Sequence, residues 1–329
     1  MRDIAKAADV SVMTVSQVLN PRNSPVRVSS ETREKILRLV DELHYQPNLA
    51  AKVLAGESSH LIGILIDSQA PAVSFRTLSC IEREAAKFGY GLMIAEAHDN
   101  VTRLSDSYHR LLRHGVDGII SLAHDYPGEE DKLRQCFSDV RKVVFIDKPC
   151  VETSLYVKLD WESGVEAAVN HLKKRGCGRI GILRSCGNWR SLQERQNGYE
   201  KTVTEAFIHF QPLTYDKAEL VRQAVESVDF IMANQLDAIL AQNDFYAAAI
   251  INELERRGLK VPQDIAVVGY DNEFFSDFFN PGISSIDWDI DRQAVAAVEM
   301  LLKTIENPGM AISPVIVKNQ FIIRESVQK

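Results

Sequence analysis

The sequence predicts a small all-helical head followed by an α/β core of two lobes, each built on a doubly wound parallel sheet. Three observations predict this division. Residues 1–46 contain helical patterns but no strand pattern, residues 47–60 form a short apolar stretch with a polar tail, and residues 61–329 alternate strand runs with helical runs. Strands that alternate with helices are typical of parallel sheets covered by helices. A chain of 329 residues is also long enough for two or three domains.

The first twenty residues predict two short helices joined by a tight turn. Asp9 lies where such a turn requires a positive φ, and Ser11 is a suitable N-cap for a second helix that ends at Leu19. This arrangement is a helix-turn-helix, which many proteins use to read DNA, although an ordinary helical hairpin has the same pattern. The exposed face of the second helix is expected to carry Val12, Met13, Ser16, Gln17 and Asn20.

A loop, a third helix and a short apolar segment complete the region before the core. The loop contains Arg22 and Arg27, which can contact phosphates, and Ser29 is a suitable cap for the third helix. An apolar stripe at helical spacing should direct that helix toward the first two. The stripe consists of Ile36, Leu39, Val40 and Leu43. The apolar segment LAAKVLA, which Asn48 can cap, is too short to be a stable helix in water by itself.

The core is expected to begin with a buried strand at residues 61–67 and to continue as alternating strands and helices. Further strands are expected at 90–97, 116–123, 142–147, 179–183, 237–242 and 264–270. Helices are expected at 76–88, 102–114, 163–175, 191–208, 217–233 and 244–257. In open sheets of this kind, ligands bind beyond the carboxyl ends of the strands, which here means a cleft between the lobes.

Charge and cysteine usage limit where and how the protein acts. The net charge of −7 divides into +1 for residues 1–58 and −8 for the remainder. A head so weakly basic should bind DNA poorly by itself, so we expect two copies on each site. Five scattered cysteines and a polar N-terminal helix favour a cytoplasmic protein. No apolar run approaches the roughly 20 residues that a membrane-spanning helix needs, so no membrane role is expected.

The motifs that could indicate catalysis, a metal site or a cofactor site lack the surrounding elements or residues that these functions require. Residues 176–181 match G-x-G-x-x-G, but a helix precedes them and a strand follows, which is the reverse of the order that a dinucleotide site needs. The acids Asp287, Asp289 and Asp291 start like a calcium loop, but the required glycine and glutamate are missing. No grouping of Ser, His, Cys and Asp suits nucleophilic catalysis. We therefore expect no enzyme activity, no metal and no cofactor.

The order of several motifs identifies the chain as resembling the LacI/GalR family of bacterial transcriptional repressors over essentially its full length. The matching stretches are DIAKAADVSVMTVSQVLN, VSSETREKIL, LHYQPNLAAKVLAG, VDGII, RIGIL, ERQNGY, NDFYAAAI, VPQDIAVVGYDN and IIRES. The resemblance implies a core like the type I periplasmic binding proteins, in which the chain crosses between the lobes three times. The first lobe would then comprise about 61–157 and 288–316, and the second about 158–285 and 317–329.

The resemblance also implies which residues contact DNA. Val12, Met13 and Gln17 would read base edges, with Val12 and Met13 as core residues the alternative, while Ser16 and Asn20 would bind phosphates. The segment from Asn48 to Gly56 resembles a hinge helix that folds against its twin on the DNA. Within it, Leu54 would enter the minor groove, Ala51 would allow close approach, and Lys52 would reach a phosphate.

For a small-molecule effector the resemblance points most strongly to Arg195 and Asp244, which would bind ligand hydroxyls or a ligand anion. Further wall residues implied by position are Phe75, Asp160, Trp161, Arg190, Ser191 and Asp271. We expect a homodimer on a palindromic double-stranded DNA operator, controlled by a sugar or sugar derivative. A purine-responsive regulator is one alternative, although Val73 and Ser74 stand where many relatives have aromatic residues. A cytoplasmic solute receptor without a role on DNA is the alternative from another class.

Overall fold

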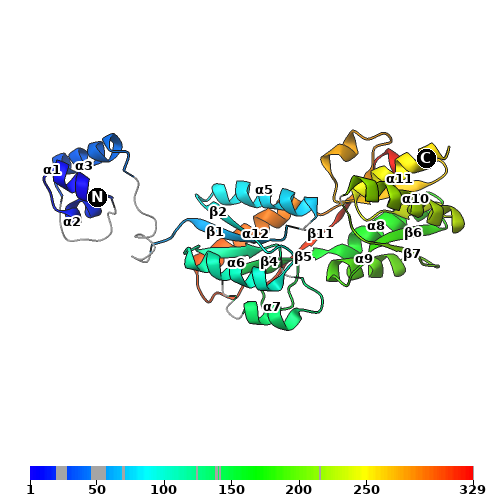
Figure 1. The fold of residues 1–329 in the computed structure, drawn as a ribbon, viewed down its shortest axis with the longest axis horizontal. Helices are drawn as coiled ribbons and strands as arrows, with labels where there is room; N and C mark the ends of the chain where they lie inside the picture. The colour runs from blue at the N-terminus through cyan, green and yellow to red at the C-terminus, as the bar shows by residue number, and fades with distance from the viewer. Residues whose placement is uncertain are drawn as a thin grey trace. The chain divides into compact units, whose positions relative to one another are not determined.

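The computed structural model describes residues 1–19, 28–45, 57–68, 71–123, 125–137, 140, 142–214 and 216–328. It divides the chain into two units, a head of Met1–Ser59 and a core of His60–Lys329 (Figure 1). The predicted fold class of a helical head and two parallel-sheet α/β lobes is confirmed. Among the described residues, none of the helices combines the length and the apolar composition that a membrane span requires.

The head packs three helices around one small core. These are α1 (Arg2–Ala8), α2 (Val12–Leu19) and α3 (Ser30–Glu42). As predicted, Asp9 has a positive φ of 56°, and Ser11 and Ser29 accept the backbone N–H of Thr14 and Thr32, respectively. The buried residues are Ile4, Ala5, Ala8, Val15, Val18 and Ile36.

One expectation for α3 was wrong. Leu43 does not join the apolar stripe but is half exposed, because α3 ends at Glu42 and the chain turns at Leu43 and His44. Tyr45 and Val28 instead pack against the edge of the head core, together with Leu39 and Val40.

The first lobe is built on a parallel sheet with the strand order β11-β5-β4-β3-β1-β2. Its strands are β1 (Leu61–Ile66), β2 (Gly91–Glu96), β3 (Gly118–Ser121), β4 (Val143–Ile146), β5 (Tyr156–Asp160) and β11 (Val315–Lys318). One face packs on α5 (Ala72–Ala86) and α12 (Ile290–Glu306). The other packs on α6 (Val101–Arg113) and α7 (Glu130–Cys136).

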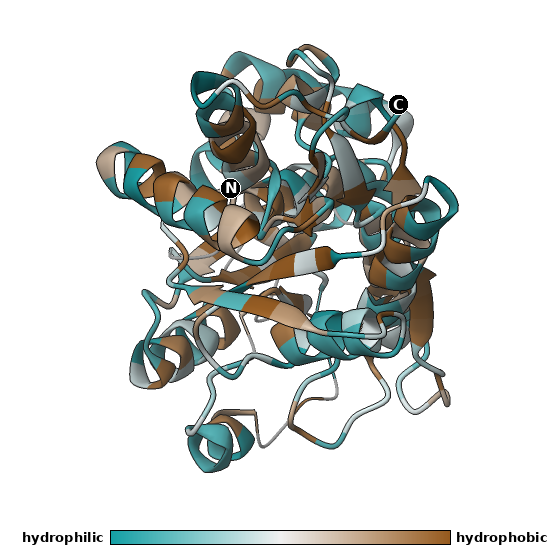
Figure 2. Cartoon of the chain, turned by 90° about the vertical axis from the view of Figure 1, so that its right-hand side faces the viewer, coloured by the Kyte–Doolittle hydropathy of each residue, from teal (hydrophilic) through white to brown (hydrophobic). Residues whose placement is uncertain are grey.

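The second lobe has the strand order β12-β10-β9-β8-β6-β7, parallel except that the edge strand β12 runs antiparallel to β10. Its strands are β6 (Ile180–Ser185), β7 (Phe207–Gln211), β8 (Ala238–Leu240), β9 (Ala266–Tyr270), β10 (Ser284–Asp287) and β12 (Gln320–Ile322). Its helices are α8 (Trp161–Lys174), α9 (Arg190–Glu200), α10 (Lys217–Ala233) and α11 (Asp244–Arg256), with short 3-10 helices η1 (Phe274–Asp277) and η2 (Glu325–Val327). Figure 2 shows apolar residues concentrated along the strands and mixed faces on the helices.

Some predicted boundaries differ from the structure. The helix expected at 191–208 ends at Glu200, because the chain turns there and residues 207–211 pair with β6 as an edge strand. The expected lobe boundaries at 157/158 and 316/317 fall inside β5 and β11, which pair with each other in the first sheet. The chain therefore crosses between the sheets a few residues later, after Asp160 and after Lys318.

Candidate functional site

The exposed face of α2 is the candidate DNA-reading surface. Met13 is 76% exposed and Val12 is 42% exposed, so the alternative that these two residues belong to the core is wrong. Ser16 and Gln17 are half-buried on the same short helix. The other predicted DNA contacts lie outside the described residues: Asn20, Arg22, Arg27, Asn48, Ala51, Lys52 and Leu54.

A cavity of about 700 Å³ lies between the two lobes of the core, at the carboxyl ends of their strands. Its walls come from both lobes. The first lobe contributes Asp67, Ser74, Thr77, Asp99, Asp125, Tyr126 and Asp147, among others. The second contributes Trp161, Arg184, Trp189, Ser191, Arg195, Gln242, Tyr270 and Asp271, and Trp288 lies where the chain returns to the first lobe. A volume of this size suits a small-molecule ligand.

Arg195 stands over an aromatic floor at one end of this cavity. Its guanidinium lies 3.6 Å from the centroid of the Tyr270 ring and 4.7 Å from that of Trp161. One guanidinium nitrogen, Nη1, is 3.4 Å from the backbone oxygen of Gln242, and Nε has no hydrogen-bond partner among the described residues. Cation–π contacts thus hold the side chain in place while leaving it donors for a ligand.

Two buried carboxylates accompany Arg195 in the cavity wall. Burial raises the pKa of Asp271 to about 7, although the nearby Arg195 charge acts to lower it. Burial also raises the pKa of Asp147, against the hydrogen bond of 2.6 Å that its Oδ2 accepts from the Trp161 indole N–H. Both carboxylates can accept hydrogen bonds from ligand hydroxyls when ionised.

Asp244 does not line the cavity, contrary to the prediction. It is fully buried beneath the wall, and its carboxylate is occupied by the protein itself. Its Oδ2 accepts the Glu273 backbone N–H and the Ser276 hydroxyl, and its Oδ1 accepts the Ser285 hydroxyl at 2.7 Å. Gly269 makes room for it, since a Cβ there would lie 1.9 Å from Oδ1. Asp244 therefore holds together the loops that follow the strands.

Three other predicted ligand residues also lie away from the cavity lining. Phe75 is on the outward side of α5, 40% exposed. The Asp160 carboxylate accepts the Ser163 N–H and so caps α8. Arg190 is not among the lining residues, and its backbone N–H donates to Oδ2 of Asp125 of the first lobe. Of the predicted set, Trp161, Ser191, Arg195 and Asp271 are the residues that the structure brings together.

Side-chain contacts also connect the lobes next to the cavity. Arg76 of α5 donates to the backbone oxygen of Asp271 at 3.0 Å and forms an ion pair with the buried Glu273 at 3.4 Å. Lys158 of β5 pairs with Glu194 of α9 at 3.6 Å. The relative position of the lobes therefore depends on groups that adjoin the ligand cavity.

Sequence reasoning missed several cavity residues. Asp147 directly follows the strand of residues 143–146, so its position after a buried strand was a usable signal. Arg184 and Gln242 stand at the ends of β6 and β8 and gave no motif. Their position depends on strand register, which local sequence does not reveal.

Comparisons with known proteins agree with this geometry. A family model described as bacterial regulatory proteins, lacI family, matches residues 1–48, and one described as periplasmic binding protein-like domain matches residues 169–327. The HTH-type transcriptional repressor PurR of Histophilus somni (strain 129Pt) is 27% identical, covering 100% of this chain and 98% of the relative.

Solved structures extend the agreement to the whole chain. The Lac repressor dimer bound to operator and the anti-inducer ONPF is 25% identical, has a TM-score of 0.85, and is matched over 99% of this chain and 98% of that one. A ribose operon repressor from Lactobacillus acidophilus shares the core fold at 23% identity, with a TM-score of 0.71 over 83% of this chain and 100% of that one.

A helix-turn-helix head followed by a two-lobe core with a ligand-sized cavity defines a DNA-binding regulator that responds to a small molecule. The two family models and the full-length likeness place the chain more narrowly. Its head matches the lacI family of bacterial regulatory proteins, and over its full length the chain resembles transcriptional repressors of that family.

Proposed function

We propose that this regulator is a homodimeric repressor whose affinity for a palindromic operator is controlled by a carbohydrate bound between the lobes. The observation that supports a carbohydrate as the ligand is the joint presence of aromatic rings and charged hydrogen-bonding groups in one cavity. Trp161 and Trp288 meet edge to face with centroids 4.5 Å apart, and Arg195, Asp147 and Asp271 adjoin them. Sugars present apolar faces to rings and hydroxyls to carboxylates and guanidinium groups.

A purine is the second candidate, because several relatives that match over the full length are named PurR. The described cavity supports this candidate less well. Its acidic side chains outnumber its basic ones, and the guanidinium of Arg195 already lies 3.6 Å from the centroid of the Tyr270 ring. A flat heterocycle would have to compete with the guanidinium for that ring.

Control of DNA binding follows from the position of the cavity. A ligand that binds groups of both lobes stabilises one angle between them, and Arg76 and Lys158 already make contacts across the same gap. The lobe angle would set the separation of the two hinge segments and so the fit of two heads to a palindrome. Couplings of this kind are typically about 1–3 kcal/mol, which changes affinity about 5- to 150-fold.

The test combines DNA binding with ligand binding. A gel shift on DNA that contains the protein's own promoter region should give a specific complex that weakens with salt. A thermal-shift screen of sugars and nucleobases then identifies the effector, since a ligand at a hundred times its Kd stabilises a protein by about 2.7 kcal/mol. Stabilisation by nucleobases alone would show that the effector is a nucleobase and not a carbohydrate. The absence of a specific DNA complex would refute the proposed repressor function.

A further inference from the structure

Arg184, near the end of β6, is a buried cation that takes no part in the carbohydrate contacts proposed above for Arg195, Asp147 and Asp271. It lines the cavity, is only 9% exposed, and its Nε has no hydrogen-bond partner among the described residues. One guanidinium nitrogen lies 3.3 Å from the backbone oxygen of Ser185, and the group sits 5.2 Å from the centroid of the Phe210 ring. No described carboxylate forms an ion pair with it.

Strand register places Arg184 two strands away from Tyr270, a ring of the aromatic floor. Ile182 pairs with Leu240, and Leu240 pairs with Val268, so Arg184, Gln242 and Tyr270 occupy corresponding positions at the ends of β6, β8 and β9. Neighbouring strands lie about 4.8 Å apart, which puts the Arg184 backbone about 10 Å from that of Tyr270. A ligand that contacts Arg195 over Tyr270 can therefore reach Arg184 with a group at its far end.

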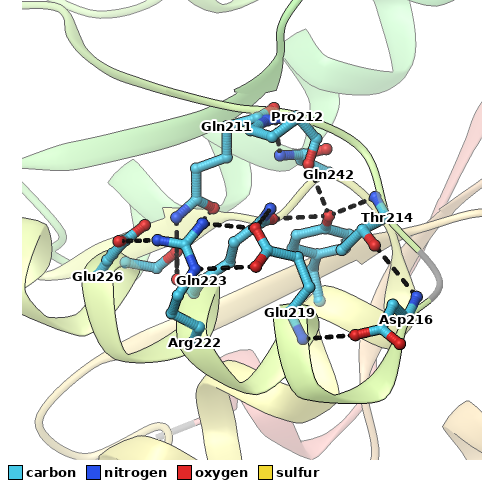
Figure 3. Close-up of polar contacts among 11 residues, drawn as sticks. Gln211, Pro212, Thr214, Asp216, Glu219, Arg222, Gln223, Glu226 and Gln242 are labelled. Carbon is cyan, nitrogen blue, oxygen red and sulfur yellow. Dashed lines mark hydrogen bonds and ion pairs between the residues drawn. The ribbon is translucent and has the colours of Figure 1, made fainter.

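The wall beside Arg184 is held by the polar network drawn in Figure 3. Gln242 donates its Nε2 to the backbone oxygen of Gln211 at 3.3 Å, which leaves its buried Oε1 without a partner among the described residues. The Tyr246 hydroxyl accepts the Thr214 N–H at 2.9 Å and lies 2.8 Å from Oε1 of Gln223. These contacts preorganise the wall, so a ligand needs to order little of it.

A buried guanidinium without a counter-ion is unfavourable, because its desolvation is not repaid by a paired charge. An anionic ligand group supplies that charge, and a carboxylate matches the planar fork of arginine with two parallel hydrogen bonds. The cavity walls already contain six aspartates against two arginines, which favours a singly charged carboxylate over a dianionic phosphate. The unpaired Gln242 Oε1 can accept a hydrogen bond from a ligand hydroxyl nearby.

We propose that the effector is an acidic saccharide, a uronic or aldonic acid, whose carboxylate binds Arg184 while a nearby hydroxyl donates to Oε1 of Gln242. This inference rests on the proposed carbohydrate-responsive function and names the class of carbohydrate. It adds Arg184 and Gln242 to the site as the residues that determine specificity for the acid.

Isothermal titration of the full chain tests the proposal. The probes are D-glucuronate, D-galacturonate and D-gluconate, with D-glucose and D-galactose as the neutral counterparts and the two hexose 6-phosphates as the alternative anions. At least one acid should bind about 10- to 100-fold more tightly than its neutral counterpart, the gain typical of hydrogen bonds to a charged group. Arg184→Met should abolish that preference, and Arg184→Lys should retain part of it.

Arg179 provides the matched control, because its guanidinium also lies over a phenylalanine, 4.4 Å from the Phe207 centroid, but at the other end of the same strand pair. Arg179→Met should leave the preference for the acid unchanged. Circular dichroism and the operator gel shift establish that each variant is folded.

Several outcomes would overturn the inference. Equal binding of acids and neutral sugars, tighter binding of the phosphates, or an undiminished preference in folded Arg184→Met would each refute the Arg184 carboxylate site while leaving a carbohydrate effector intact. Binding of nucleobases with no binding of any sugar or sugar acid would refute the carbohydrate effector itself, and the inference with it.

Discussion

Asp244 and Asp271 are two aspartates of the second lobe whose pKa burial raises, to about 6 and about 7, respectively. Asp244 is enclosed by the Ser276 and Ser285 hydroxyls and has no contact with the cavity. Asp271 lines the cavity beside Arg195. At the scale of the residue, the same side chain thus has a structural role in one place and is a candidate ligand contact in the other.

Replacing Asp244 with alanine should destabilise the core without changing what the cavity recognises. The substitution leaves two buried hydroxyls and the Glu273 N–H without their acceptor, which costs about 1–3 kcal/mol for each buried donor that finds no new partner. Urea denaturation measures the loss. Asp271→Asn is the comparison variant, and it should instead weaken effector binding. Weakened effector binding in Asp244→Ala without a loss of stability would contradict the structural role of Asp244.

The raised pKa of Asp271 predicts how stability depends on pH. Between its usual value near 3.8 and about 7, the carboxyl is protonated in the folded protein but ionised in the unfolded chain. The folded state therefore binds more protons, and the free energy of unfolding should fall as pH rises from about 4 to about 7 and level off above that. Asp244, whose pKa burial raises to about 6, lies in the same cluster, so the decline belongs to the two aspartates together.

Denaturation of the effector-free protein at several pH values measures this decline. In Asp271→Asn the decline should be shallower by more than about 1 kcal/mol, since each unit of pKa difference corresponds to about 1.4 kcal/mol. If the free energy of unfolding falls equally with pH in the wild type and in the variant, protonation of Asp271 is not the cause of the decline.

Helix α2 shows how a short element is fixed for recognition by contacts at its ends. The Ser11 hydroxyl accepts the Thr14 N–H at its start, and Val15 and Val18 anchor its inner face. Next to it, Lys35 of α3 donates to the backbone oxygen of Ala8 at 2.9 Å, where the negative end of the α1 dipole lies. The outer face, with Met13, is left free to contact DNA.

At this scale, Met13→Ala should lower affinity for the operator about tenfold and leave affinity for random DNA unchanged, because an apolar base contact carries sequence information and a phosphate contact does not. Gel shifts on both DNAs give the ratio. Leu43→Ala, which removes another exposed apolar side chain of the head, is the control and should leave both affinities unchanged. Equal losses on both DNAs would argue against base contact by Met13.

Charge and exposed apolar surface both bear on the proposed homodimer. The head carries a balance of only +1 before an acidic core. The loop around η1 exposes two large aromatic side chains, Phe274 at 76% and Phe278 at 84%. Exposed aromatic residues of this size usually mark a protein interface. They support the proposed homodimer, in which two weak heads bind one palindrome together.

Phe278→Asp should therefore convert the protein from dimer to monomer and weaken operator binding by about a hundredfold or more, because the second head no longer binds as part of the same molecule. Light scattering at micromolar concentration measures the mass. Met310→Asp, at an exposed methionine on the first lobe, is the matched control and should remain dimeric. A Phe278→Asp variant that stays dimeric would place the interface elsewhere.

Local sequence determined the parts of this protein that depend on neighbouring residues. Helix caps at Ser11 and Ser29, the turn at Asp9 and the helix at 217–233 all follow from contacts within a few positions. The strand and helix alternation likewise indicated two lobes and a ligand beyond the strand ends. Four predicted cavity residues, including Arg195 and Asp271, followed from the family resemblance.

Which side chains face the cavity became clear only from the folded chain. Asp244 begins the helix after β8 and Asp271 follows β9, yet one is sealed under the wall and the other lines it. Phe75 points outward, whereas Trp288 becomes part of the cavity where the chain crosses between lobes. The direction of a side chain depends on strand register and on the packing of segments far apart in the sequence. That information is shared among distant residues and is absent from any one stretch.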